Sequence, residues 1–174
     1  MTPEERRSKI VALLSKNSHP VAGSRLASEL SVSRQVIVQD VSILRASGKE
    51  ILSTPRGYMI ARNYNSAPYR KTFAVRHNMT QMEDELYIIV DAGGTVIDVI
   101  VEHPLYGELK GMLMLKSRRD VKEFAERKRA TGSKMLSDVT GGIHLHTVEA
   151  EKEDVFSYIE AELSRAGYLL DICD

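Results

Sequence analysis

The sequence predicts an α+β protein made of two domains. The first 62 residues contain three short stretches in which apolar residues recur at helical spacing, and a hairpin pattern follows them. Residues 71–174 alternate β-branched runs with helical segments, and turn residues join several neighbouring runs directly. Such hairpins favour an α+β sandwich with mainly antiparallel strands over a doubly wound parallel sheet.

Capping and turn residues mark the elements of the N-terminal domain, residues 1–62. Thr2 is an N-cap candidate, with proline at the first helical position and Glu5 three residues after the cap. Ser33 is placed to cap the third helix, and residues 55–57 form the turn of the hairpin. We expect helices up to residue 16, at 24–30 and at 34–47, and strands at 51–54 and 58–60.

A linker joins this domain to the second one. Residues 63–70 lack periodicity and carry turn-forming residues, so we interpret them as the linker. The second domain, residues 71–174, is expected to begin and to end with a strand. Its predicted strands lie at 71–75, 95–101, 108–115, 135–139, 143–148 and 168–172, and its predicted helices at 80–92, 119–130 and 154–166.

Charge is distributed unevenly between the two predicted domains. The chain has 24 Lys and Arg against 24 Asp and Glu, so its formal net charge is zero. Residues 1–62 hold ten of the basic and five of the acidic residues, which leaves 14 basic and 19 acidic residues for 63–174. A basic module joined to an acidic one is typical of a DNA-binding domain on a sensing domain. Chance variation between two halves is the alternative explanation of these counts.

Composition excludes several classes of protein. No stretch approaches the roughly 20 apolar residues that a membrane span needs, and the N-terminal residues lack the apolar centre of a signal peptide. Cys173 is the only cysteine, which excludes a disulfide framework and is typical of a reducing compartment. We therefore expect a cytoplasmic protein without a membrane partner.

The third predicted helix carries side chains suited to reading DNA. A helix fits the major groove of double-stranded DNA, where its first two turns meet the base edges, and arginine pairs with guanine as glutamine does with adenine. The competing interpretation is a solvated helix face beside an unrelated hairpin. The candidates for base contacts are Ser33, Arg34, Gln35 and Gln39, and those for phosphate contacts are Arg25 and, at the hairpin tip, Arg56.

Histidines gather in the second domain. His144 and His146 flank Leu145 in a predicted strand, so both imidazoles point to the same face. His77 ends the first strand of this domain, and Glu85 lies on the helix that follows. Histidine nitrogens with a carboxylate suit Zn²⁺, Ni²⁺, Fe²⁺ or Co²⁺ rather than Mg²⁺ or Ca²⁺. Spacing alone leaves a second interpretation open, in which the histidines are exposed or hydrogen-bonded without a metal.

His103 lies in the turn between the predicted strands 95–101 and 108–115. A histidine at a hairpin tip can contact an effector, support such a contact, or simply satisfy the turn. We take His103 as a candidate for effector binding, since ligand pockets place a few polar groups among apolar ones.

Three stretches of the sequence resemble known families. Residues 29–36, Glu-Leu-Ser-Val-Ser-Arg-Gln-Val, are similar to the turn and recognition helix of the winged helix-turn-helix of the biotin-repressor type. Residues 99–108 and 141–147, the second reading Gly-Gly-Ile-His-Leu-His-Thr, resemble signature stretches of the three-histidine (3H) domain. From about residue 5 to residue 172, the chain resembles the nicotinate-responsive repressors of the NiaR (YrxA) type.

This resemblance implies a repressor with a winged helix-turn-helix domain and a 3H domain. It implies a divalent transition metal, nickel or zinc, beside a pocket for nicotinic acid, which acts as corepressor of genes for NAD biosynthesis or niacin uptake. The implied metal ligands are His77, Glu85, His144 and His146. Because such DNA-binding domains read two half-sites, we expect a homodimer on a double-stranded DNA operator.

Two other functions stay open from the sequence. In the first, the metal itself is the signal, and the chain is a metal-responsive transcription regulator. In the second, the histidines and the glutamate activate water as in a metallohydrolase, and the N-terminal domain only anchors it to DNA. The sequence shows no clear separate general base or oxyanion-binding loop, although the acidic run Glu83-Asp84-Glu85 keeps a hydrolase from being excluded outright. We therefore expect a regulator and not an enzyme.

Overall fold

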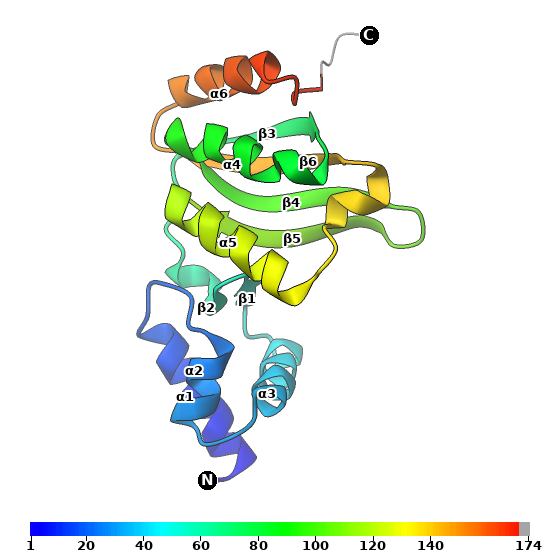
Figure 1. The fold of residues 1–174 in the computed structure, drawn as a ribbon. Coiled ribbons are helices and arrows are strands. Elements are labelled where there is room, and N and C mark those ends of the chain that lie inside the picture. Colours follow the sequence, from blue (N-terminus) through cyan, green and yellow to red (C-terminus); the bar gives the residue numbers. More distant parts are fainter. Residues whose placement is uncertain (171–174) are drawn as a thin grey trace. The chain divides into compact units, whose positions relative to one another are not determined.

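The computed structural model describes residues 1–170, and the chain divides into two compact units, Met1–Asn65 and Ser66–Asp174 (Figure 1). The division lies inside the predicted linker 63–70. That linker is shorter than predicted, because Tyr69 and Arg70 already belong to the first strand of the second unit. None of the helices within residues 1–170 has the length and apolarity that a membrane crossing requires.

The N-terminal unit has the three helices and the hairpin that the sequence predicts. The Thr2 side chain accepts a hydrogen bond from the Glu5 backbone N–H, and the Glu5 carboxylate accepts one from Thr2. The Ser33 hydroxyl caps the third helix by accepting from the Val36 N–H. The elements are α1 (Pro3–Ser15), α2 (Gly23–Glu29), α3 (Arg34–Ala46), β1 (Ile51–Thr54), β2 (Gly57–Ile60) and the 3₁₀ turn η1 (Ala61–Asn63).

One face of each helix in this unit is buried in a shared apolar core. Ile37, Val41 and Leu44 of α3 belong to the same buried cluster as Leu14 of α1 and Leu26 of α2. Burial of such an aliphatic side chain contributes roughly 1.5–3 kcal/mol. This face therefore holds α3 against the other two helices and leaves its opposite face for other contacts.

A buried ion pair also connects α1 to α3. Asp40 of α3 is 2% exposed, and its carboxylate accepts a hydrogen bond from Nε of Arg6 at 2.5 Å. Arg7 of the same helix lies 3.5 Å from the other carboxylate oxygen. The hydrogen bond with Asp40 raises the pKa of the Arg6 guanidinium. The orientation of α3 on α1 is thus fixed by charge as well as by packing.

The hairpin of this unit is tied to the segment before α2. Val21 and Tyr58 exchange two backbone hydrogen bonds, of 2.8 and 2.9 Å. Gly57 beside this bridge has a φ of +135°, and a Cβ here would lie 2.1 Å from the Val21 carbonyl oxygen. Only glycine permits this close approach of the two chains.

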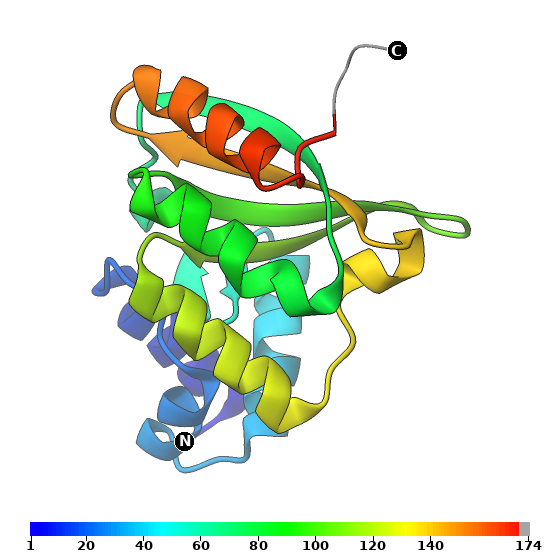
Figure 2. The ribbon, with the colours of Figure 1, turned by 45° about the horizontal axis from the view of Figure 1, so that its top comes forward.

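The C-terminal unit is a four-stranded antiparallel sheet whose strands follow the order β3-β6-β4-β5. Three helices lie over one face of the sheet (Figure 2), and the apolar core of the unit lies between them and the strands. The elements are β3 (Tyr69–Arg76), η2 (Met79–Gln81), α4 (Met82–Asp91), β4 (Thr95–His103), β5 (Gly107–Leu115), α5 (Arg118–Thr131), η3 (Leu136–Thr140), β6 (Ile143–Ala150) and α6 (Asp154–Arg165).

The predicted strand at residues 135–139 is wrong. Most of this stretch forms the 3₁₀ turn η3, which Asp138 supports by accepting a hydrogen bond from the Met135 N–H at 2.9 Å. The next strand predicted from the sequence, at residues 143–148, lies within β6. That strand, β6, pairs with β3 on one side and β4 on the other, so neither of its edges is open.

The predicted strand at residues 168–172 is reduced to a bridge within the described residues. Leu169 forms this single bridge with Val75 of β3. Asp171 and Ile172, the last two residues of that predicted strand, lie outside the described residues, as does Cys173.

Candidate metal centre and DNA-contacting surface

Four side chains from three segments of the C-terminal unit meet between the sheet and α4. His144 and His146 lie on β6, His77 follows the end of β3, and Glu85 lies in the first turn of α4. Because β3 and β6 are antiparallel, with Val75 opposite His144, the residue that follows β3 comes close to the beginning of β6. The positive end of the α4 dipole favours a carboxylate at the position of Glu85.

Each of the four side chains lies close to at least two of the others. Nε2 of His77 lies 3.5 Å from Oε2 of Glu85, and Nε2 of His146 lies 3.4 Å from the same oxygen. The His144 ring lies 4.8 Å from the His77 ring and 4.7 Å from the His146 ring, centroid to centroid. One ligand atom each from His77, Glu85 and His144 lie within 4.8 Å of one another. Three of the four predicted ligands thus form one close group, while His146 lies beside it through its contacts with Glu85 and His144.

Backbone carbonyls orient all three imidazoles. Each Nδ1 lies 2.6–2.8 Å from a carbonyl oxygen, which can only accept a hydrogen bond. Each Nδ1 therefore carries a proton, and the lone pair of each neutral ring is on Nε2. Outer hydrogen bonds of this kind hold metal-ligating histidines in position. The pairs are His77 with Asn78, His144 with Gly142, and His146 with Asp98.

Burial and mutual attraction set the charges of this cluster. Burial opposes the ionisation of Glu85, but the attraction of His146 and contact with His77 outweigh it and lower the pKa of Glu85 to about 2. Burial, together with repulsion from His146, lowers the pKa of His144 to about 4. Burial also favours the neutral forms of His77 and His146, yet Glu85 outweighs it and raises the pKa of each. The carboxylate is an anion that attracts positive charge.

Atoms aimed into the cluster lack hydrogen-bond partners among the described residues. They are both carboxylate oxygens of Glu85 and Nε2 of His77, and all three are buried. Leaving a buried polar group without a hydrogen bond costs on the order of 1–3 kcal/mol, and more for a charged one. A divalent cation would satisfy these atoms, and three imidazole nitrogens with one carboxylate are a donor set for zinc or nickel. The residues present fit a transition metal.

Gly142 connects two of the ligand candidates. It has a φ of +93°, and a Cβ here would lie 2.3 Å from the His77 carbonyl oxygen. Its carbonyl accepts the hydrogen bond from His144, and its N–H donates to the Ser137 carbonyl at 2.9 Å. Glycine is thus required for the close approach of the two chains that carry His77 and His144.

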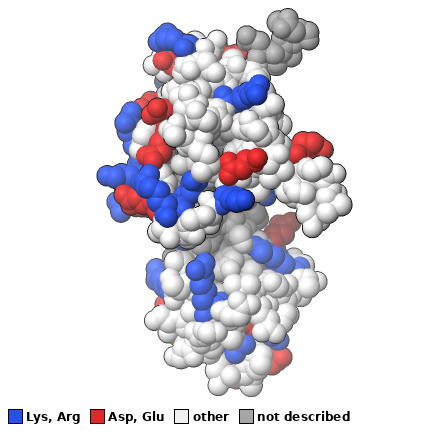
Figure 3. Space-filling view, turned by 45° about the vertical axis from the view of Figure 1, so that its right-hand side comes forward, with Lys and Arg blue, Asp and Glu red and all other residues white. Residues whose placement is uncertain are grey.

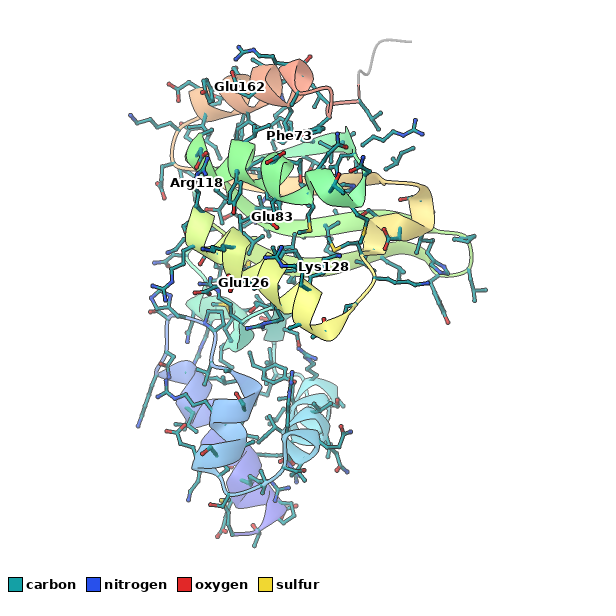
Figure 4. The ribbon with its side chains drawn as sticks, viewed as in Figure 1. Phe73, Glu83, Arg118, Glu126, Lys128 and Glu162 are labelled. Atoms are coloured by element: carbon teal, nitrogen blue, oxygen red, sulfur yellow. The ribbon has the colours of Figure 1, made fainter. Side chains whose placement is uncertain are left out.

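Contacts between α4 and α5 hold the helix that carries Glu85. Arg118 of α5 donates to both carboxylate oxygens of Asp91 near one end of α4, at 2.5 and 2.7 Å. Near the other end, Arg129 of α5 donates to Glu83 at 2.7 Å. Figure 4 labels Arg118 and Glu83 in the layer that these helices form over the sheet. These pairs, together with apolar packing, fix the position of α4 and therefore of the buried carboxylate.

A cavity of about 520 Å³ lies beside the cluster, next to His77. A small chamber of about 20 Å³ lies among the four ligand candidates themselves. Four residues line both spaces, so the larger cavity adjoins the cluster directly. The shared residues are His77, Met82, Met135 and Ser137.

His103 lies at the tip of the hairpin between β4 and β5. Its Nδ1 accepts hydrogen bonds from the backbone N–H groups of Leu105 and Tyr106, at 3.1 and 3.2 Å. The described residues that line the cavity and the chamber do not include it. His103 therefore stabilises the hairpin turn through these two hydrogen bonds. That it contacts an effector stays a prediction.

The predicted base-reading residues share the exposed face of α3. Arg34, Gln35 and Gln39 are exposed, while Ile37 and Val41 on the opposite face are buried. Ser33 is exposed too, although its oxygen already caps the helix. The first two turns of α3 thus present two amides and a guanidinium, side chains that form bidentate pairs with adenine and guanine.

The two predicted phosphate contacts differ in exposure. The Arg25 side chain is 64% exposed and lies 3.9 Å from Glu29, an ion pair that is weak at a surface. Arg56 is half-buried in the turn of the hairpin, where its N–H donates to the Thr54 hydroxyl. Basic side chains are scattered over the face of the N-terminal unit that Figure 3 shows. The phosphate contacts stay predictions, and Arg25 is the more accessible of the two.

Comparison with known proteins identifies both units. The family described as HTH domain matches residues 6–59, and the 3H domain family matches residues 70–172. The chain is 41% identical over 168 residues to the "Probable transcription repressor NiaR" of Thermotoga maritima, a match that covers 97% of this chain and 95% of that protein. It is 37% identical over 167 residues to the "Transcription repressor NadR" of Bacillus subtilis, covering 95% and 93%. The chain belongs to the NiaR/NadR-type transcription repressors.

Membership in the NiaR/NadR-type repressors decides between the classes of function that the sequence left open. The chain is a DNA-binding transcription repressor with an HTH domain and a 3H domain. The predictions of family, fold class and transcription repression are confirmed. Between a regulator and a metallohydrolase, the matches support the regulator. The metal, the effector and the assembly are not decided by these matches.

Sequence reasoning missed several residues around the centre of this NiaR/NadR-type repressor. Asn78, Asp98 and Gly142 act through backbone carbonyls, which no side-chain pattern reveals. The paired glycines before β6 were a usable signal for Gly142, because adjacent glycines mark special backbone conformations. Arg76 was missed because nothing local distinguishes it from other surface arginines, yet it lines the cavity.

Proposed function

We propose that this repressor binds a divalent transition metal, nickel or zinc, and nicotinic acid in the adjoining cavity. The loaded protein then represses genes for NAD biosynthesis or niacin uptake, with nicotinic acid as the corepressor. The metal ligands in this proposal are His77, Glu85, His144 and His146. The observation that carries it is the buried cluster, in which three oriented imidazoles lie around a carboxylate that has no hydrogen-bond partner within residues 1–170.

The three histidines and the one carboxylate support the proposal that the bound metal also accepts a ligand from the cavity. Three histidines and one carboxylate leave positions free on an ion with octahedral preference, and a pyridine nitrogen or a carboxylate suits such a position. The protein's own residues hold and orient the ligand atoms, while apolar neighbours such as Leu86 and Phe124 enclose the chamber. When bound, the metal supplies a Lewis-acid contact at the edge of the cavity.

The cavity and the family support a small organic effector. The volume of the cavity, about 520 Å³, lies within the range of small-molecule sites, roughly 300–1,000 Å³. The stretches at residues 99–108 and 141–147 resemble signature stretches of the 3H domain, and the chain from about residue 5 to residue 172 resembles the nicotinate-responsive repressors. Nicotinic acid combines an aromatic ring, a pyridine nitrogen and a carboxylate, so it offers a group to the metal and another to the protein.

Repression in this proposal depends on a homodimer. Two copies of α3 read the two half-sites of an operator, and effector binding favours the arrangement in which both helices fit the major groove. A coupling free energy of about 1–3 kcal/mol between effector and operator gives a change in operator affinity of up to about 100-fold. A repressor of this kind acts in the cytoplasm, where the operator is.

Calorimetric titration tests the effector assignment. We expect the nickel- or zinc-loaded chain to bind nicotinic acid and to bind nicotinamide more weakly. His144→Ala removes one proposed ligand and abolishes binding of the acid, whereas His19→Ala replaces an exposed histidine of the N-terminal unit and leaves binding unchanged. If the loaded protein binds neither compound but metal alone changes operator affinity, the chain is a metal-responsive regulator and the nicotinic acid proposal fails.

A further inference from the structure

We propose that Arg76 binds the carboxylate of the effector and makes the repressor select a small aromatic acid over the corresponding amide. This inference rests on the proposed function, because it concerns the same cavity. It adds the residue that decides which ligand is accepted, which neither the metal ligands nor the family match assigns.

Arg76 is held at the cavity by its place in the sheet. It is the last residue of β3, directly before His77, and pairs with Ile143 of β6. Its N–H donates to the Tyr168 carbonyl at 2.8 Å, which fixes the backbone. Because side chains alternate along a strand, the fully buried Val75 points into the core and Arg76 points out of it. Arg76 is exposed and lines the cavity beside the metal ligand candidate His77.

Arg76 is the permanent positive charge of this cavity. No other Lys or Arg occurs among the described residues that line it. Within residues 1–170, no hydrogen bond or ion pair engages the Arg76 guanidinium, in contrast to Arg118 and Arg129, which contact acidic residues of α4. The one acidic residue of the lining, Asp138, already accepts a hydrogen bond from the Met135 N–H. The guanidinium is therefore available to an anionic ligand.

The remaining lining suits an aromatic ring. Met79, Met82 and Met135 contribute thioether side chains, of which Met82 is buried and Met79 is 46% exposed. Methionine sulfurs make favourable contacts with aromatic rings and adapt to the shape of a ligand. The cavity lining thus combines apolar methionines with the cation Arg76 and with His77, and this combination matches an aromatic ring that carries a carboxylate.

The guanidinium distinguishes an acid from its amide by charge and geometry. It donates two parallel N–H bonds to the two oxygens of a carboxylate. A neutral amide offers one acceptor oxygen and an NH₂ group that only donates, so one of the two bonds is lost and the other is not strengthened by charge. A hydrogen bond to a charged group is worth about 1.5–3 kcal/mol, so removing it lowers affinity about 10- to 150-fold.

The test compares three variants of the full chain loaded with nickel or zinc. Arg76→Gln removes the charge, Arg76→Lys keeps the charge without the paired donors, and Arg119→Gln removes an arginine of α5 that is 87% exposed and outside the cavity. Titration calorimetry with nicotinic acid and with nicotinamide gives the ratio of the two affinities. Elemental analysis gives the metal content of each variant independently of ligand binding.

We expect Arg76→Gln to lose at least about tenfold in affinity for nicotinic acid and to keep its affinity for nicotinamide. Arg76→Lys should retain part of the preference for the acid, Arg119→Gln all of it, and all variants should hold the metal as the unaltered chain does. Unchanged selectivity in Arg76→Gln, or equal loss for acid and amide, overturns the role of Arg76 while the proposed function stands. No binding of the acid to the unaltered, metal-loaded chain overturns both proposals.

Discussion

At the scale of single residues, the centre depends on backbone groups as much as on side chains. The alternation of His144 and His146 along a strand predicted their common face, and the structure places the two rings 4.7 Å apart. Two of the carbonyls that orient the rings come from neighbours in sequence, Asn78 for His77 and Gly142 for His144, whereas the carbonyl of Asp98, which orients His146, is distant in sequence. The pair of His146 with Asp98 depends on how β6 lies beside β4 and could not be predicted locally.

Replacing Gly142 with alanine tests this dependence on the backbone. We expect Gly142→Ala to lower metal affinity at least about tenfold, since a disturbed outer shell typically costs 10- to 100-fold and the added Cβ displaces His77. The control is Gly141→Ala, because Gly141 also has a positive φ, of +62°, but its Cβ would meet nothing within 4 Å. Competition with a chelator measures both affinities. If both variants lose metal affinity equally, backbone strain at a positive φ, and not the clash with His77, is the cause of the loss.

At the scale of elements, the helix caps were predicted correctly from local sequence, whereas the strand predicted at residues 135–139 was wrong. The caps at Thr2 and Ser33 were predicted from the sequence and are present, because capping is a contact between residues three apart. Residues 135–139 carry apolar residues that suit a strand, but β6 already has two partners. A strand requires an open edge, and the occupancy of an edge is decided by the whole sheet rather than by the segment.

The exposed face of α3 gives a prediction about sequence readout. Arg34→Ala or Gln39→Ala should each cost about 1–3 kcal/mol in operator binding and relax the preference for one base pair. Binding assays on operators with single base-pair changes measure this. A loss of affinity that is equal for all operator sequences would contradict base readout by α3 and indicate phosphate contacts instead.

The buried carboxylate of α3 gives a prediction about stability. Asp40→Ala removes the partner of Arg6 and Arg7 and should destabilise the N-terminal unit by about 1–3 kcal/mol. Glu29→Ala is the control, because this carboxylate is 43% exposed and its ion pair with Arg25 is long. Hydrogen exchange of the α1 and α3 amides reports the change. Exchange that is no faster in Asp40→Ala than in Glu29→Ala would mean that apolar packing alone orients α3.

At the scale of the whole molecule, the exposed face of α3 and the histidine cluster belong to different compact units. The division near residue 65 follows the change from a basic to an acidic segment that the sequence shows. The unit with the exposed α3 face and the unit with the histidine cluster each have a core of their own. Pattern and composition predicted this organisation. The cavity at Arg76 could be located only from the fold, because its described lining residues come from two stretches far apart in sequence, 76–82 and 135–142.

The measurement that tests the account most directly is operator affinity of the metal-loaded chain with and without nicotinic acid. We predict that nicotinic acid raises this affinity by up to about 100-fold, that His144→Ala abolishes the increase, and that His19→Ala preserves it. If His144→Ala, with its metal site disrupted, still responds to nicotinic acid as the unaltered chain does, the histidine cluster is not the sensing site. Operator affinity that nicotinic acid leaves unchanged in the metal-loaded chain would contradict the corepressor function itself.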